Sequence, residues 1–260
     1  MSTIFIEEIN ELIKQQPTTD ISYKIQFNGE TYTHNEHAVY PSASTIKVPI
    51  SIINLQRHFH DYEDITLKVG KKVGGCGVLH TLQSVKRLTL WDTIVLSIII
   101  SDNTASNMLI DNLGIDRINE GFTALGLHDT TLARNYYDTT GINEGKRNAT
   151  SAADMFTSLE YVIKENDVLP EDIRKDFYEV MKKQQINDRV GGFFNIDEDD
   201  AQEFIASKTG SVTALEHDFG IIQKNGKQIV FSILSNNWPS NQEGKYFLNE
   251  VGKIFKKYMQ

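Results

Sequence analysis

Two polar residues at helical spacing raise the question of what this chain does. Ser44 and Lys47 lie three residues apart in 38-AVYPSASTIKVPISIINLQRHF-59. Residues i and i+3 of a helix share one face, so the hydroxyl and the amine can meet. A serine beside an amine that takes its proton is an activated nucleophile. A second interpretation is that Ser42 or Ser44 only caps a helix with a buried apolar side.

Two further triplets contain residues of the same chemical kinds. One is 101-SDN-103, between two expected helices, and the other is 208-KTG-210, at the end of an expected strand. Each has a simple structural interpretation: Asp102 or Asn103 could cap the helix at 104–113, and Thr-Gly could lead into a turn. Average residue usage gives each triplet by chance in only about one chain of this length in twenty. Their joint occurrence, in this order, favours a catalytic interpretation.

Ser-x-x-Lys, Ser-Asp-Asn and Lys-Thr-Gly form the signature set of class A β-lactamases and penicillin-binding proteins. The sequence resembles the class A β-lactamase-related serine hydrolases from about residue 20 to its C-terminus. The likeness extends to the segments 77-GVL-79, 101-SDNTASNMLIDNLG-114, 148-NATSAADM-155 and 217-HDFGII-222.

The resemblance implies a role for each catalytic residue. Ser44 is expected to be the acyl-accepting nucleophile, at the N-terminus of a helix that favours developing negative charge. Lys47, kept neutral by burial and by the charge of Lys208, takes the Ser44 proton. Ser101 passes a proton to the leaving nitrogen. Pro49 should make the chain irregular just after the nucleophile.

The resemblance also implies the substrate contacts. Asn103 is expected to hold an amide side chain, and Lys208 and Thr209 of the Lys-Thr-Gly210 motif to hold a carboxylate. The backbone N–H groups of Ser44 and Ser211 form the expected oxyanion hole. Asp102 is expected to be structural, His217 to be a packing residue, and Cys76 to lie in a tight loop near the site. No cofactor is implied.

The base for deacylation is where the sequence departs from the family. Class A β-lactamases activate the deacylating water with a Glu that precedes an Asn by four residues. Counting back from 148-NATSAADM-155 puts Asn135 at that place, and matching Asn-Tyr-Tyr puts Thr131 there. Glu144 precedes Asn148 by four residues, but only with a shortened loop. We therefore treat Glu144 as a weak candidate and expect slow deacylation.

The expected elements form an α+β fold. A helix near the N-terminus and a hairpin at 21–40 precede a helical stretch with helices at 90–100, 104–113, 151–165 and 170–184. Strands at 203–210, 218–223 and 228–236 and a helix at 245–259 follow. Asn28-Gly29 and Asn225-Gly226 are turn signals. One β-lactamase-like catalytic domain, 1–260, is expected: an antiparallel sheet from both chain ends with terminal helices (1–41 and 203–260), and an all-α part (42–202) that ends with the acidic loop 197–200.

Composition limits the partners. A net charge of −9 disfavours nucleic acid and anionic membranes. The start of the sequence lacks signal-peptide features and no apolar run could span a bilayer, so a cytoplasmic location is expected unless the chain was trimmed from a precursor. His34/His37 and His58/His60 do not complete a metal site.

Three functions remain open from the sequence. The first is a class A β-lactamase-type hydrolase that acts on β-lactams or related amides and esters through Ser44. The second is a D-alanyl-peptide or ester hydrolase of the penicillin-binding kind. The third is a non-catalytic β-lactam-sensing or scaffold domain. The natural substrate and the oligomeric state stay unassigned.

Overall fold

The computed structural model describes residues 2–194 and 203–260. Within these ranges, one sheet combines strands from both ends of the chain, in the order β2-β1-β9-β8-β7, and every neighbouring pair is antiparallel. Its strands are β1 (Ile21–Phe27), β2 (Glu30–His34), β7 (Glu203–Val212), β8 (Leu215–Lys224) and β9 (Lys227–Ser235). The prediction of a sheet built from both chain ends is confirmed.

Two hairpin turns close this sheet where the sequence predicted them. Asn28 and Gly29 have φ of 52° and 80°, and Asn225 and Gly226 have φ of 51° and 74°. Positive φ at both central residues is the backbone that a two-residue hairpin requires, and Asn-Gly adopts it at little cost.

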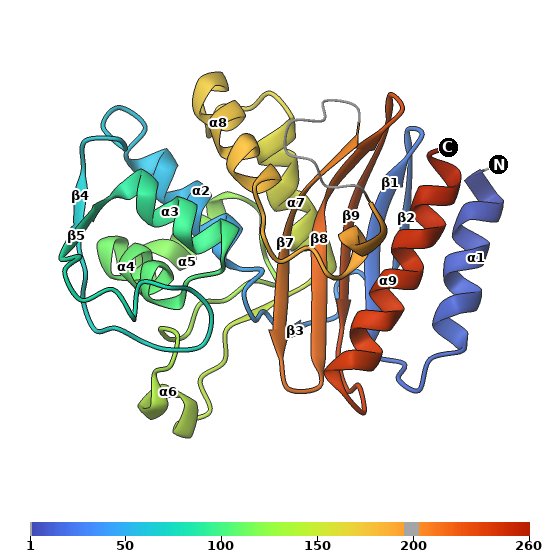
Figure 1. Ribbon diagram of the computed structural model, residues 1–260, viewed down its shortest axis with the longest axis horizontal. Helices are drawn as coiled ribbons and strands as arrows, with labels where there is room; N and C mark the ends of the chain where they lie inside the picture. Colours follow the sequence, from blue (N-terminus) through green and yellow to red (C-terminus); the bar gives the residue numbers. More distant parts are fainter. Residues whose placement is uncertain (1, 195–202) are drawn as a thin grey trace.

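Helices cover both faces of the sheet (Figure 1). The terminal helices α1 (Ser2–Lys14) and α9 (Asn241–Tyr258) lie side by side on one face, and their aromatic and aliphatic side chains form a core with the strands. On the other face, α7 (Ala152–Ile163) packs on the central strands and α8 (Glu171–Lys182) on β7. The sheet is therefore buried on both sides.

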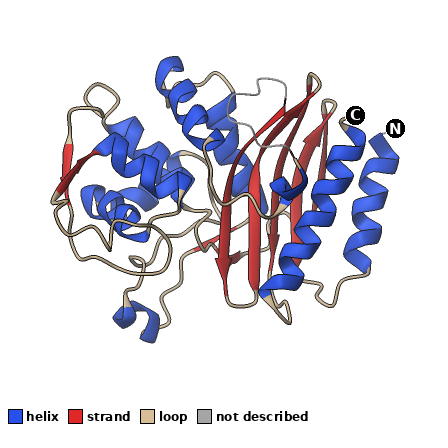
Figure 2. Ribbon diagram, in the orientation of Figure 1, coloured by secondary structure: helices blue, strands red, loops and turns tan. Residues whose placement is uncertain are grey.

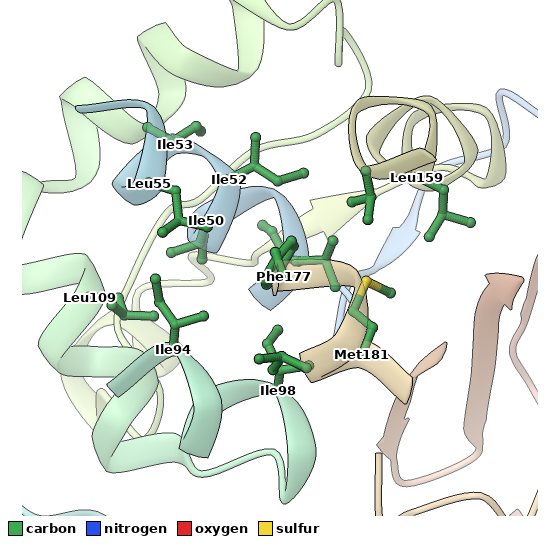
Figure 3. Packing of buried hydrophobic residues seen from close by; sticks show 14 of the residues in the cluster. Ile50, Ile52, Ile53, Leu55, Ile94, Ile98, Leu109, Leu159, Phe177 and Met181 are labelled. Atoms are coloured by element: carbon green, nitrogen blue, oxygen red, sulfur yellow. The ribbon is translucent and has the colours of Figure 1, made fainter. Parts of the chain in front are cut away.

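The helical part has its own core, to which the sheet adds a few side chains (Figure 3). Its remaining helices are α2 (Lys47–Arg57), α3 (Leu90–Ile99), α4 (Asn103–Leu113), α5 (Ile115–Ala124) and α6 (Thr139–Asn143). Thr89 caps α3 by accepting a hydrogen bond from Asp92 N, and α4 ends at Gly114. The expected helices at 90–100, 104–113, 151–165 and 170–184 are confirmed.

Short elements connect these parts, and loops carry α6 away from the other helices (Figure 2). The short elements are β3 (Tyr40–Pro41), paired with β6 (Ala149–Thr150), β4 (Thr66–Lys68), paired with β5 (Arg87–Thr89), and the 3₁₀ turn η1 (Val190–Phe193).

Some expected boundaries differ. The hairpin at 21–40 ends at His34, and α9 starts at Asn241, where Ser240 caps it, rather than at 245. The acidic run 197–200 lies outside the described residues. No helix within the described ranges is long and apolar enough to cross a membrane.

Candidate active site

Ser44 lies in a tight turn between β3 and α2. Thr45 N donates to Ser42 O at 3.1 Å and Lys47 N donates to Ser44 O at 3.3 Å, an i to i+3 pattern. Ala43 has φ of 47°, which is uncommon for a residue with a Cβ. The regular helix begins only at Lys47 and has no side-chain cap. The expectation that Ser44 is the first residue or the cap of this helix is therefore wrong, because the helix begins about one turn later.

Pro49 explains why the turn is tight. A proline has no N–H and crowds the carbonyl four residues before it, here that of Thr45. That carbonyl instead accepts a bond from Val48 N at 3.3 Å. Pro49 falls within the first turn of α2, where a missing N–H costs little. The predicted irregularity just after Ser44 is confirmed.

Lys47 is fully buried, and polar groups of the Ser-Asp-Asn segment surround its amine. Its Nζ donates to Ser101 O at 2.7 Å, to Ser101 Oγ at 3.1 Å and to Asn103 Oδ1 at 2.8 Å. Burial lowers the pKa of Lys47 well below its usual value, and the positive charge of Lys208 lowers it further. Among the described contacts, Ser44 Oγ is not an acceptor of this amine, so the direct pair drawn from i, i+3 spacing is not formed.

Ser101 connects the two buried lysines. Its Oγ lies 3.1 Å from Lys47 Nζ and 3.0 Å from Lys208 Nζ. Burial lowers the pKa of Lys208 to about 7, and the charge of Arg189 adds to the effect. Two amines that share one hydroxyl in a buried site repel each other when both are protonated. Ser101 also has φ of 56°, a strained backbone typical of functional sites.

Asp102 has a structural role. Its carboxylate is buried and accepts bonds from Val78 N at 2.7 Å, Leu79 N at 2.8 Å and Ala105 N at 2.9 Å. It therefore caps α4 and fixes the loop at 77–79 against the Ser-Asp-Asn turn. The expectation of a structural Asp102 agrees with these contacts.

Strand β7 lies directly against the Ser44 turn. A Cβ at Gly210 would lie 3.0 Å from Thr45 Cγ2, 3.2 Å from Ala43 Cβ and 3.3 Å from Ser44 N. Glycine at this position is what allows the strand backbone to come this close. The next residue, Ser211, lines the cavity that holds Ser44.

That cavity measures about 260 Å³ and opens to solvent beside Ser44. It is lined by residues from the Ser44 turn, the 75–76 loop, α4, the loop at 134–142 and the end of β7: Ala43, Ser44, Gly75, Cys76, Asn103, Arg134, Tyr136, Tyr137, Ile142, Ser211 and Val212. Cys76 is exposed there as a free thiol, and its carbonyl accepts from Asn103 N at 3.2 Å. In the described part of the chain, no group of three His, Cys, Asp or Glu residues is placed to hold a metal ion.

Comparison with known families fits this geometry. The profile of the β-lactamase enzyme family matches residues 4–259. The chain belongs to the β-lactamase enzyme family. This confirms the resemblance that the three motifs carried, and it makes the protein a β-lactamase-family enzyme.

Solved structures place the chain within the family's fold. A β-lactamase from Sphaerobacter thermophilus is 26% identical with a TM-score of 0.84, over 98% of this chain and 96% of that one. A variant of PBP-A, described as an acyl-enzyme complex with penicillin G, is 22% identical with a TM-score of 0.84 over 98% and 96%. A class A β-lactamase from Bacteroides cellulosilyticus is 20% identical with a TM-score of 0.80 over 96% and 95%. The search of curated proteins gave no match.

In this β-lactamase-family enzyme, none of the three positions considered for a deacylation base faces Ser44. Glu144 follows α6, is 53% exposed, and pairs with Lys146 at 2.9 Å. Asn135 donates to Asp111 on α4 at 2.8 Å, and Thr131 pairs with Ala149. Within the described ranges, no carboxylate lines the Ser44 cavity. The tentative assignment of Glu144 is therefore not supported by its position.

Tyr136 is a loop residue that reaches the Ser44 turn. Its ring centre lies 4.5 Å from Lys47 Nζ, and its OH donates to Ala43 O at 3.0 Å. Asn107 holds the backbone on both sides: Tyr136 N donates to Asn107 Oδ1 at 2.7 Å, and Asn107 Nδ2 donates to Tyr136 O at 3.0 Å. Burial raises the Tyr136 pKa, so the phenol stays protonated. Sequence reasoning used the Asn-Tyr-Tyr string only for counting and missed this role.

A buried ion pair between Glu216 on β8 and Arg189 supports the Ser44 cavity through Ser211. Glu216 is fully buried and lies 2.8 Å from Arg189, which is 3% exposed. The other oxygen of Glu216 accepts from Ser211 Oγ at 2.7 Å and from Asn241 Nδ2 at 2.7 Å. The sequence signal was available, since the charged run 216-EHD-218 directly precedes the apolar run 219-FGII-222 of the same strand. Buried charges in a strand need partners, and here one partner is the Ser211 hydroxyl.

His217 positions the segment that leads to Ser44. Its Nδ1 accepts from Ser235 N at 3.1 Å, so the proton of the neutral ring lies on Nε2, which donates to Pro41 O at 3.0 Å. Burial lowers the pKa of His217 to about 4. The ring stays neutral and is no base, in line with the expected packing role.

Proposed function

We propose that the protein is a serine hydrolase that β-lactams or related amides and esters acylate at Ser44, with slow release of the acyl group. The carrying observation is the buried Lys47–Ser101–Lys208 arrangement next to the Ser44 turn. Burying two amines around one hydroxyl destabilises the fold, and such arrangements are found mainly at functional sites. Retention of these amines argues against a scaffold without chemistry.

Acylation transfers one proton from the Ser44 hydroxyl to the leaving group of the substrate. Neutral Lys47 takes the proton of Ser44 as Ser44 Oγ attacks the substrate carbonyl carbon. This step requires the Ser44 hydroxyl, which interacts with the Tyr136 phenol, to turn toward Lys47; catalytic hydrogen bonds often align only when the substrate binds. The same proton returns through Ser101 Oγ to the leaving nitrogen or oxygen as its bond to the acyl carbon breaks.

The remaining groups hold the substrate. The N–H groups of Ser44 and Ser211 stabilise the oxyanion, because Gly210 lets β7 approach the turn. Protonated Lys208, with Thr209, attracts a carboxylate on the leaving side. Asn103 lines the cavity and offers its amide to the acyl side.

Slow deacylation follows from the loop. A water on the ester carbonyl needs a base, and the described part of the cavity lining offers no carboxylate. Instead, the Tyr136 ring covers the loop side of Lys47. PBP-A, a structural relative, is described as an acyl-enzyme complex with penicillin G in one variant, which supports acylation by a penicillin here. These features favour β-lactam capture or slow D-alanyl-peptide or ester turnover over rapid β-lactam hydrolysis.

A labelled penicillin tests the acylation step. The wild-type protein should carry the label after denaturing electrophoresis, and Ser44→Ala should carry none. Ser42→Ala is the matched control, because Ser42 lies two residues away in the same turn but its hydroxyl makes only a weak contact, 3.5 Å to Ala43 O. Labelling that persists in Ser44→Ala would remove the nucleophile assignment.

A further inference from the structure

A second cavity, of about 360 Å³, adjoins the Ser44 cavity on the side of the loop that carries α6. The two share five lining residues: Ala43, Arg134, Tyr136, Ile142 and Val212. The second cavity does not include Gly75, Cys76 or Asn103, which line the Ser44 cavity alone. It therefore extends the site in one direction, past the residue next to the nucleophile and past the end of β7.

The charged residues described around this second cavity are all basic. Arg134, Lys146 and Arg147 line it, and within the described ranges no acidic residue does. A third cavity, beyond the same loop, shows the contrast, because there Arg134, Lys146 and Lys71 face Asp111 and Asp138. In a chain of net charge −9, three cations around one cavity beside the nucleophile are an exception.

Two of the three cations have no acidic partner among the residues that the structure describes. Arg134 uses its Nε and Nη1 on the carbonyls of Lys146 and Asn135, each at 3.0 Å, which are neutral acceptors. Arg147 is exposed, and among the described ion pairs neither arginine takes part. Lys146 pairs with Glu144 at 2.9 Å. Guanidinium N–H groups bind carboxylates well, and among the described hydrogen bonds Nη2 of Arg134 and the whole guanidinium of Arg147 are uncommitted.

This second anion site differs from the one that Lys208 supplies. Lys208 Nζ lies on Ser101 Oγ, on the side of the Ser-Asp-Asn turn, and lines neither cavity. A substrate with its leaving-side carboxylate at Lys208 extends its acyl side toward Val212 and the loop. We propose that Arg134 and Arg147 form a subsite for an anionic group on the acyl side, so that the preferred acyl donors carry a carboxylate there. This inference rests on the proposed function for the direction of the substrate.

A pair of penicillins isolates this charge. Benzylpenicillin and carboxybenzylpenicillin differ only by a carboxylate on the acyl side chain. The ratio of their second-order acylation constants should favour carboxybenzylpenicillin in the wild-type protein. It should fall about two- to fivefold in Arg147→Gln, the size of one exposed ion pair. Arg147→Glu should lower it further, and salt should reduce it in the wild-type protein.

Arg117→Gln is the matched control, because Arg117 is an exposed arginine on α5 that lines neither cavity, and it should keep the wild-type ratio. Arg147 is used rather than Arg134, whose hydrogen bonds hold the loop. A ratio that is the same in the wild-type protein, Arg147→Gln and Arg147→Glu would overturn the subsite.

A second measurement tests the subsite even if the proposed acylation does not occur. If neither penicillin acylates the protein, the subsite is judged by NMR titration with the two acyl parts as amides, phenylacetamide and phenylmalonic acid monoamide. Preferential binding of the monoamide that is lost in Arg147→Glu supports the subsite. Equal binding of the two amides to the wild-type protein contradicts it.

Discussion

Replacing Tyr136 by glutamate should convert a slow deacylation step into a faster one. The Tyr136 ring centre lies 4.5 Å from Lys47 Nζ, beside the Ser44 turn. An extended glutamate places its carboxyl carbon about as far from Cα as tyrosine places its ring centre. Tyr136→Glu therefore puts a carboxylate near Lys47 and frees the volume of the ring for a water.

The size of the effect follows from what is missing. A positioned general base contributes typically about 10²–10⁴-fold to a rate. A carboxylate about 4 to 5 Å from a protonated Lys47 also forms an ion pair worth about 3 to 4 kcal/mol at an effective dielectric constant of about 20. That pairing keeps the carboxylate ionised but also favours the protonated form of Lys47, so less of the neutral amine is available to accept the Ser44 proton. We therefore expect deacylation to accelerate by about 10²-fold, at the low end of the range, and acylation to slow.

Rapid-quench intact mass spectrometry of the penicillin adduct measures both steps. Tyr136→Gln is the control, since it opens the same volume without a base and should deacylate almost as slowly as the wild-type protein. Equal acceleration in the Gln and Glu variants would show that the ring acts only by excluding water. No acceleration in Tyr136→Glu would refute the assignment of this position as the deacylation side of the site.

Three further outcomes follow from the buried polar groups. Acylation by carboxylate-bearing penicillins should fall toward acid pH as Lys47 becomes protonated, and above about pH 7 as Lys208 loses its proton; Lys208→Arg should move the alkaline limb upward in a stopped-flow pH profile. The pKa of Lys208 is about 7 in the folded protein and about 10.4 in the unfolded chain. Between these pH values the unfolded chain binds one more proton than the folded protein, so the free energy of unfolding should rise from pH 7 to 10. Lys208→Met should flatten that rise in urea unfolding; an unchanged slope would contradict the depressed pKa. Asp102→Ala should cost about 3–5 kcal/mol of unfolding free energy, since it leaves three N–H groups, two of them buried, without an acceptor. Asp138→Ala, which loses one partly exposed bond, should cost about 1 kcal/mol or less.

Much of the fold could be predicted because its signals are local. Thr89 with Asp92, Gly114, and the two Asn-Gly turns fix the ends of elements through their own backbone preferences. Apolar spacing then assigned most helices and strands. The motif residues Ser44, Lys47, Ser101 and Lys208 could be grouped because each motif has a known place in the family's fold.

The loop from 131 to 150 could not be predicted because distant partners set its path. Asn148 Oδ1 accepts from Ala133 N at 2.8 Å and from Arg134 N at 3.1 Å, and Asn107 on α4 fixes Tyr136. Counting along the sequence therefore offered Asn135, Thr131 or Glu144 without showing which faces the nucleophile. The left-handed backbone at Ala43 and Ser101 was hidden for the same reason, because tertiary contacts impose it on residues that rarely adopt it.

Peptide mapping of the wild-type protein after a long incubation with benzylpenicillin, with the reaction stopped in acid, measures the site and the lifetime of the adduct together. We expect one penicillin per chain, attached to the peptide that contains Ser44, and most of it still present after the excess penicillin is removed. An adduct on another residue would contradict the nucleophile. Rapid loss of the adduct with steady hydrolysis would contradict the missing base and show that this loop deacylates the enzyme by other means.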